Sequence, residues 1–177
     1  MKYYDWGYSL FELLIVVIIT ITLLLIANIT INRLTNKYYI NCISRQMISD
    51  FYLARSEAIM LKTNVVISIN KANNVLHTNG YYKIFIDNGK NNGIPNNWIQ
   101  DGGEKLLVFR KMTKDIKLYK CTFYNNKTGY QANGSPLKQR WGSIYLRNKN
   151  KFYRMTLILT GRVKLYYSNN GKTWKWR

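Results

Sequence analysis

The chain has 177 residues and carries 27 lysines and arginines against 8 aspartates and glutamates, a formal net charge of +19. This length suits one membrane helix and one globular domain. A positive excess of this size favours anionic partners, namely nucleic acid, anionic lipid or acidic polymers.

The positive charge is concentrated in the C-terminal part of the chain. From Lys105 to Arg177 there are 18 lysines and arginines and a single acid, Asp115. The C-terminal part is therefore the cationic one. The alternative explanation is that abundant lysine and asparagine reflect only the nucleotide bias of an AT-rich genome.

The N-terminal segment is apolar but contains one acid. Residues 1–7 form a short polar leader that ends in Gly7, and an apolar run follows to about residue 31, with Glu12 near its start. An ionisable side chain inside a membrane-spanning segment is costly and marks a functional site by default. A secretory signal is cleaved after its apolar region, at small residues. Here the small residue Gly7 comes before the apolar region. The alternative interpretation of this segment is an ordinary signal anchor in which Glu12 has no function.

The apolar run predicts a membrane-spanning helix that continues into the globular part. The span to residue 31 is close to the roughly 20 residues that cross the hydrocarbon core, and in lipid all backbone groups must pair within the segment. From Arg33 the sequence becomes amphipathic, with Asp50 and Arg55 among the residues expected on the solvent face. Apolar residues recur at spacings of three or four, as on one helix face: Ile40, Ile43, Met47, Phe51, Ala54, Ala58 and Leu61. We predict one helix over residues 8–62, packed on its own domain rather than in a coiled coil.

Beyond this helix the pattern changes to strands. Runs rich in β-branched and aromatic residues predict strands at 65–69, 81–86, 105–110, 116–124, 143–147, 152–159, 162–167 and 173–176. Residues 87–103 and 129–139 are rich in Asn and Gly and predict loops, the first long enough to be functional or mobile. A long helix followed by a mostly antiparallel sheet over residues 63–177 is an α+β fold.

Few residues have the types and spacings that catalysis or metal binding needs. His77 is the only histidine, and no nucleophile–base pair, paired carboxylates or Walker-type phosphate loop is apparent. Asp87, Asp101 and Glu104 bracket the first loop, where we expect them to be solvated. We predict no catalytic residue, no metal and no cofactor.

The two cysteines are far apart in the sequence and lack metal-ligand spacing. If the globular part lies outside the inner membrane, Cys42 and Cys121 have an oxidising environment in which a disulfide can form. Two separate buried thiols are the alternative.

Three segments resemble the GspH/FimT family of minor pilins and pseudopilins. They are residues 7–14 (GYSLFELL), residues 54–59 (ARSEAI) and residues 160–164 (TGRVK). The first is shared by type IV pilin-like proteins in general, and the other two are similar to this family in particular. The resemblance implies a type IV pilin-like fold, a single pass through the inner membrane, and a periplasmic C-terminal domain.

The same resemblance implies how the chain matures and assembles. A prepilin peptidase would cleave after Gly7 and leave Tyr8 as a new, usually methylated, N-terminus. Glu12 would then pair with the terminal amine of a neighbouring pilin subunit in a pilus or pseudopilus.

The resemblance further implies DNA binding near the C-terminus. In the transformation-linked FimT branch a Gly-Arg-x-Arg motif binds DNA, and here Lys164 replaces the second arginine, keeping the charge but losing the bidentate fork. In a strand Arg162 and Lys164 share one face, and Gly161 would let a phosphate approach the backbone. A turn near Gly171 is expected to bring the tail back beside this motif, adding further cations and two stacking side chains: Lys172, Lys175, Arg177, Trp174 and Trp176.

The predicted function is that of a minor type IV pilin that binds DNA non-specifically during DNA uptake. One alternative is a minor pseudopilin of a type II secretion system. Another is a structural minor pilin that primes pilus assembly without binding DNA. In both alternatives the segment around Arg162 is a cationic edge strand that lysines keep soluble, with the tryptophans covering the sheet.

Overall fold

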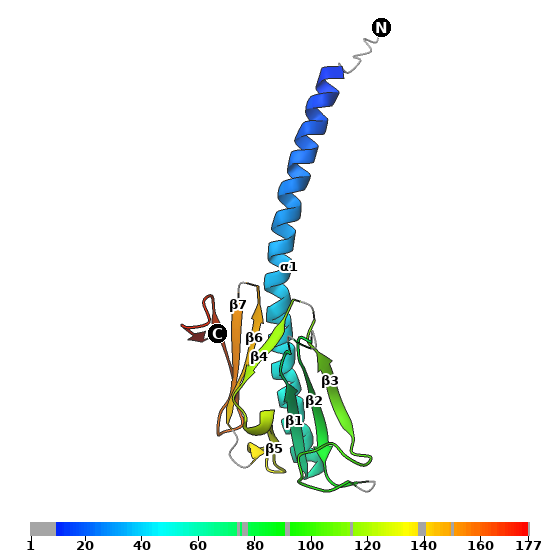
Figure 1. The fold of residues 1–177 in the computed structure, drawn as a ribbon, viewed down its shortest axis with the longest axis vertical. Helices are drawn as coiled ribbons and strands as arrows, with labels where there is room; N and C mark the ends of the chain where they lie inside the picture. The colour runs from blue at the N-terminus through cyan, green and yellow to red at the C-terminus, as the bar shows by residue number, and fades with distance from the viewer. Residues whose placement is uncertain are drawn as a thin grey trace, which may run out of the picture. The chain divides into compact units, whose positions relative to one another are not determined.

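The computed structural model describes residues 10–73, 75, 78–90, 93–113, 115–137, 141–149 and 151–176 (Figure 1). Gly7 and Tyr8, where cleavage is predicted, lie outside the described residues, as does Arg177. The chain divides into two compact units, with the boundary between Tyr38 and Tyr39, and each is described separately.

The first unit contains the N-terminal part of helix α1, which spans Leu10–Leu61. Residues Leu10–Ala27 have a mean hydropathy of 3.0, and among the described residues they form the one helical stretch long and apolar enough to cross a membrane. A signal sequence near an N-terminus has the same properties. The hydroxyls of Thr20 and Thr22 each donate to the backbone carbonyl three residues earlier, at 2.8 Å. These bonds satisfy both hydroxyls within an apolar segment.

In the second unit, the part of α1 from Tyr39 onward packs through one apolar face. Ile43 is half-buried at this face, whereas Leu61 is 46% exposed, so the apolar stripe ends one turn earlier than predicted. Burying a large apolar side chain contributes roughly 1.5–3 kcal/mol, which explains why this face is held against the sheets. The fully buried members of the stripe are Ile40, Met47, Phe51, Ala54 and Ala58.

The strands form two antiparallel sheets rather than one (Figure 1). The four-stranded sheet has the order β3 (Leu106–Lys111), β2 (Tyr81–Asp87), β1 (Asn64–Asn70) and β5 (Lys127–Tyr130). The five-stranded sheet has the order β4 (Lys117–Cys121), β6 (Gly142–Asn148), β7 (Lys151–Leu157), β8 (Val163–Ser168) and β9 (Lys175–Trp176). A short 3-10 helix, η1, covers Tyr124–Asn126. The predicted α+β class is confirmed.

The main core joins the helix to both sheets. One cluster of buried side chains includes Phe51 from α1, Ile67 from β1 and Ile144 from β6. A second cluster holds Val66, Phe85, Trp98 and Leu137. Since Val66 and Ile67 are neighbours in β1 and belong to different clusters, the centre of the four-stranded sheet is covered on both faces.

Strand β5 was not predicted, because its sequence places Gly129 within a run that is typical of a loop. In the structure Gly129 pairs with Val66 of β1. A Cβ on Gly129 would lie 2.1 Å from the carbonyl oxygen of Val65, so only glycine allows this close approach. The predicted loop at 129–139 therefore begins later, and the predicted strand at 116–124 ends at Cys121 before η1.

Asp50 was expected on the solvent face of the helix but is buried. Its carboxylate accepts hydrogen bonds from the hydroxyl of Tyr82 (2.7 Å), from Nε of Arg110 (3.3 Å) and from Nε2 of Gln46 (3.0 Å). The helical period placed Asp50 between apolar positions. Its burial is tolerable because two sheet residues opposite it, together with Gln46 on the same helix, donate to its carboxylate.

The loop after β2 is held by carboxylates rather than being solvated. Asp87 is buried and accepts hydrogen bonds from the backbone N–H groups of Asn96 (2.7 Å) and Trp98 (2.9 Å). Asp101 and Glu104 likewise accept bonds from backbone N–H groups of the loop. The three acids expected in solvent therefore stabilise the loop conformation.

Candidate nucleic-acid interface

The turn before β8 requires a glycine and is anchored from two other elements. Gly161 has a φ of +77°, and a Cβ on it would lie 2.8 Å from the carbonyl oxygen of Gly134 and 3.2 Å from the guanidinium carbon of Arg55. The hydroxyl of Tyr130 on β5 donates a bond of 3.2 Å to the carbonyl of Gly161. Burial raises the pKa of Tyr130, which keeps its hydroxyl a donor. Two segments that carry the family resemblance, around Arg55 and Gly161, thus meet here.

Gly161 itself is buried, with its α-carbon facing Gly134 and Arg55. The structure therefore gives this glycine a role in shaping the turn. Direct contact of Gly161 with a phosphate stays a prediction from the sequence.

Arg162 and Lys164 project from one exposed face, as the strand alternation predicts. Val163 packs against the main core and Leu165 is buried, whereas both cations are exposed. Arg162 lies immediately before β8 rather than within it. The pair is therefore carried on the face of the five-stranded sheet that points away from the core, which we call the outer face.

The tail folds back on β8 through the predicted turn, but it does not pair with the predicted motif at Arg162 and Lys164. Asn170 forms the turn by accepting bonds through Oδ1 from the backbone N–H groups of Lys172 (2.9 Å) and Thr173 (3.0 Å). Strand β9 then pairs with β8, with Tyr166 opposite Trp176. The tail thus lies beside Tyr166 and the residue after it, at the end of β8 away from Arg162.

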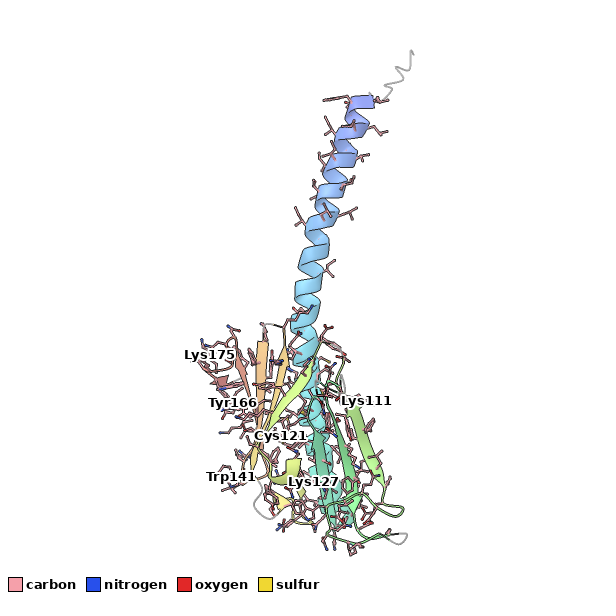
Figure 2. The ribbon with its side chains drawn as sticks, in the orientation of Figure 1. Lys111, Cys121, Lys127, Trp141, Tyr166 and Lys175 are labelled. Carbon is pink, nitrogen blue, oxygen red and sulfur yellow. The ribbon has the colours of Figure 1, made fainter. Side chains whose placement is uncertain are left out.

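The predicted tail residues divide between the two faces of the hairpin. Trp176 is opposite Tyr166 and shares the outer face, where it is 70% exposed. Lys175 is opposite Tyr167, whose side chain packs against the core, so this lysine belongs to the other face. Figure 2 shows Lys175 and Tyr166 together at the five-stranded sheet. Lys172 is exposed in the turn.

Trp174 is half-buried because it covers part of the outer face. Its ring centroid lies 5.6 Å from that of Tyr145 on β6, with an interplanar angle of 70°. The guanidinium carbon of Arg154 lies 5.0 Å from the Trp174 centroid and 4.4 Å from that of Tyr166. The guanidinium of Arg154 is therefore in cation–π contact with both rings.

Most of the side chains on the outer face are not among the residues predicted to bind DNA. The signal that could have found them is the alternation within the predicted strands, where aromatic or cationic residues occupy every second position between core residues. The side chains of the outer face that were not predicted are Tyr119, Lys120, Tyr145, Arg147, Phe152, Arg154 and Tyr166.

The ring of Tyr119 stays neutral. Burial raises the pKa of Tyr119, and the neighbouring Tyr145 raises it further.

The remaining predicted positions lie elsewhere. Glu12 is exposed in the first turn of α1, in the first unit. Cys42 is exposed on α1 and Cys121 is half-buried on β4, and these two described residues are not joined by a disulfide. Among the described residues, no group of three His, Cys, Asp or Glu side chains is placed to hold a metal ion.

An apolar N-terminal helix followed by antiparallel sheets is consistent with a pilin-like architecture. Comparisons of the chain with family models, with curated proteins and with solved structures found no match.

Proposed function

We propose that this chain is a minor subunit of a type IV pilin-like filament whose C-terminal domain binds DNA without sequence preference during DNA uptake. The observation that carries the proposal is the pair Arg162 and Lys164, held side by side on an exposed face by the burial of Leu165. No acid follows Asp115 in the sequence, so little opposes an anion there.

The chemistry of this pair suits a sequence-independent ligand. Arginine and lysine contact phosphate oxygens, which carry no base information. Such contacts release condensed counterions, so affinity falls steeply with salt. A protein that captures any DNA needs this kind of recognition.

The N-terminal part of the proposal concerns assembly. The apolar stretch Leu10–Ala27 supports anchoring in the inner membrane, with the second unit in the periplasm. Cleavage after Gly7 by a prepilin peptidase would give Tyr8 a cationic amine. Glu12, at the start of α1, is the acid that this amine would meet on a neighbouring subunit.

The test uses the full chain in an uncharged detergent and a labelled DNA duplex. We expect Arg162→Ala combined with Lys164→Ala to weaken binding and to reduce the salt slope by about 1 for each lost phosphate contact. The control pair is Lys105→Ala with Lys111→Ala, two exposed cations at and beside β3 of the other sheet, where Figure 2 shows Lys111. Equal losses from both pairs would mean that bulk charge binds DNA, and the structural alternatives would then be preferred.

A further inference from the structure

We propose that the outer face of the five-stranded sheet binds single-stranded DNA, with bases stacked on its aromatic side chains and phosphates held by its arginines and lysines. This inference rests on the proposed function, because it specifies which form of DNA is bound and by which surface.

The strand register builds a row of cations and aromatic rings across all five strands. Lys120 of β4 is opposite Tyr145 of β6, which is opposite Arg154 of β7. Arg154 is in turn opposite Tyr166 of β8, and Tyr166 is opposite Trp176 of β9. Residues directly opposite each other in neighbouring strands share one face, so these five side chains form a continuous band.

A second group of side chains widens the band. Arg147 and Phe152 are opposite each other in β6 and β7. Tyr119, beside the bulge in β4, contacts both groups, since its ring centroid lies 6.0 Å from that of Phe152 and 5.9 Å from that of Tyr145. Trp174 packs on Tyr145 from the tail. The rings therefore form one surface rather than isolated residues.

Cations already lie over the faces of these rings. Nζ of Lys120 is 5.4 Å from the centroid of Tyr145, and the guanidinium carbon of Arg147 is 5.8 Å from that of Tyr119. Both cations are exposed, and cation–π contacts at exposed sites are weak. A phosphate can therefore draw each side chain aside and leave a ring face for a base.

One hydrogen-bond donor of Arg154 has no acceptor among the residues that the structure describes. Its Nε is buried, and no described residue accepts a hydrogen bond from it. The ring of Trp174, just before the short strand β9, lies 5.0 Å from this guanidinium. Displacement of that ring by a base would give Arg154 access to a phosphate oxygen.

The charges around the face select an anion. A cavity of about 340 Å³ at its edge is lined by Lys117, Arg147 and Lys149, with Phe152 beside them and Asp115 as its one acid. Lys164 extends the cationic surface at the other end, opposite Thr156 of β7. A neutral sugar polymer would use the rings but gain nothing from these cations.

Single strands rather than duplex suit the rings. In a duplex the base faces are stacked inside the helix and cannot lie on a sheet, whereas a single strand exposes them. Sheet platforms that combine aromatic rings with a cationic groove bind single strands with little sequence preference, because every base has a π-face. Duplex phosphates would still reach Arg162 and Lys164.

The experiment measures binding of a labelled 20-nucleotide thymidine oligomer and of a 20-base-pair duplex to the full chain in an uncharged detergent. Tyr145→Leu with Tyr166→Leu removes two rings but keeps apolar cover on the sheet. The matched control is Tyr81→Leu with Phe109→Leu, a ring pair 5.4 Å apart on the other sheet. Thermal melting of each variant confirms that it is folded.

We expect the Tyr145/Tyr166 variant to lose about tenfold or more in affinity for the single strand, since each stacked ring contributes roughly fivefold to 150-fold. Its affinity for the duplex should change less than twofold, and the control should change neither. The Arg162/Lys164 variant should weaken duplex binding, which tests the proposed function separately.

The inference is overturned if the Tyr145/Tyr166 variant loses no more single-strand affinity than the control, or loses duplex affinity equally. Binding of a neutral glucan is measured with the same variants. The inference is also overturned if the Tyr145/Tyr166 variant keeps single-strand binding but loses glucan binding, because the rings would then recognise a sugar polymer. If the wild type binds neither form of DNA, the proposed function fails as well.

Discussion

The hydroxyl of Tyr130 donates a hydrogen bond of 3.2 Å to the carbonyl of Gly161, and this bond ties the four-stranded sheet to the turn that carries Arg162. Tyr130 lies on β5, at the edge of its sheet, and is fully buried. The position of the cationic pair therefore depends on contacts from another sheet as well as on β8 itself.

Removal of this hydroxyl should loosen the turn without disturbing the core. We expect Tyr130→Phe to lower the free energy of unfolding by about 0.5–1.5 kcal/mol, the net contribution of one hydrogen bond. Urea denaturation of the full chain in detergent measures this. Tyr38→Phe removes an exposed hydroxyl and should change stability by less than about 0.5 kcal/mol. An equal loss in both variants would contradict a specific role for the Tyr130 bond.

Substitution of Gly161 should cost more than substitution of Gly171. Both have positive φ, so an alanine at either position is strained by about 1–2 kcal/mol. At Gly161 the new Cβ would also lie 2.8 Å from a carbonyl oxygen, whereas at Gly171 the nearest atom is 3.4 Å away. We therefore expect Gly161→Ala to lower the melting temperature more than Gly171→Ala. The opposite order would show that the turn before β8 can move.

Tyr82 should make stability sensitive to alkaline pH. Burial, together with the nearby Asp50, raises the pKa of Tyr82 above its ordinary value. Its contribution to folding is therefore fully present below about pH 10 and falls as the pH rises further, where the unfolded chain ionises and the folded one resists it.

Tyr82→Phe tests this relationship, because it also removes a donor from a buried carboxylate. We expect the free energy of unfolding to fall by about 1–3 kcal/mol at pH 8. The difference from wild type should shrink at pH 11, as followed by urea midpoints. A difference that stays constant with pH would show that the hydroxyl contributes only by packing.

Glu12 should matter for assembly and not for processing. If its carboxylate meets the amine of a neighbouring subunit, Glu12→Ala should still be cleaved after Gly7 but enter the filament poorly. The measurement compares cleaved chain in the membrane with chain in the sheared filament fraction. Glu57→Ala, in the C-terminal part of the same helix, serves as the control. Normal incorporation of the Glu12 variant would rule out this pairing.

The two cysteines should react with thiol reagents at different rates. Cys42 is exposed, whereas burial raises the pKa of Cys121 and reduces its reactive thiolate. We expect maleimide to label Cys42 first in the native protein and both residues in urea. Recovery of a Cys42–Cys121 disulfide from cells would contradict the structure, in which both cysteines are free thiols.

The sequence predicted those features that depend on local periodicity. The stripe from Ile40 to Ala58 follows the helical period, and the alternation around Val163 places Arg162 and Lys164 outside. Both patterns arise because burial selects every third or fourth residue of a helix and every second residue of a strand. Strand β5 was not predicted, because Gly129 has no side chain to show such a pattern.

Local patterns in the chain are therefore enough to predict the helix, nearly all of the strands, the apolar segment and the concentration of positive charge near the C-terminus. Which faces meet depends on the packing of the folded chain. It buried Asp50 against Tyr82, joined Tyr130 to Gly161, and aligned Lys120, Tyr145, Arg154, Tyr166 and Trp176 in one row. The physical reason is that strand register and sheet packing arise from contacts between residues distant in the chain, which local periodicity does not encode.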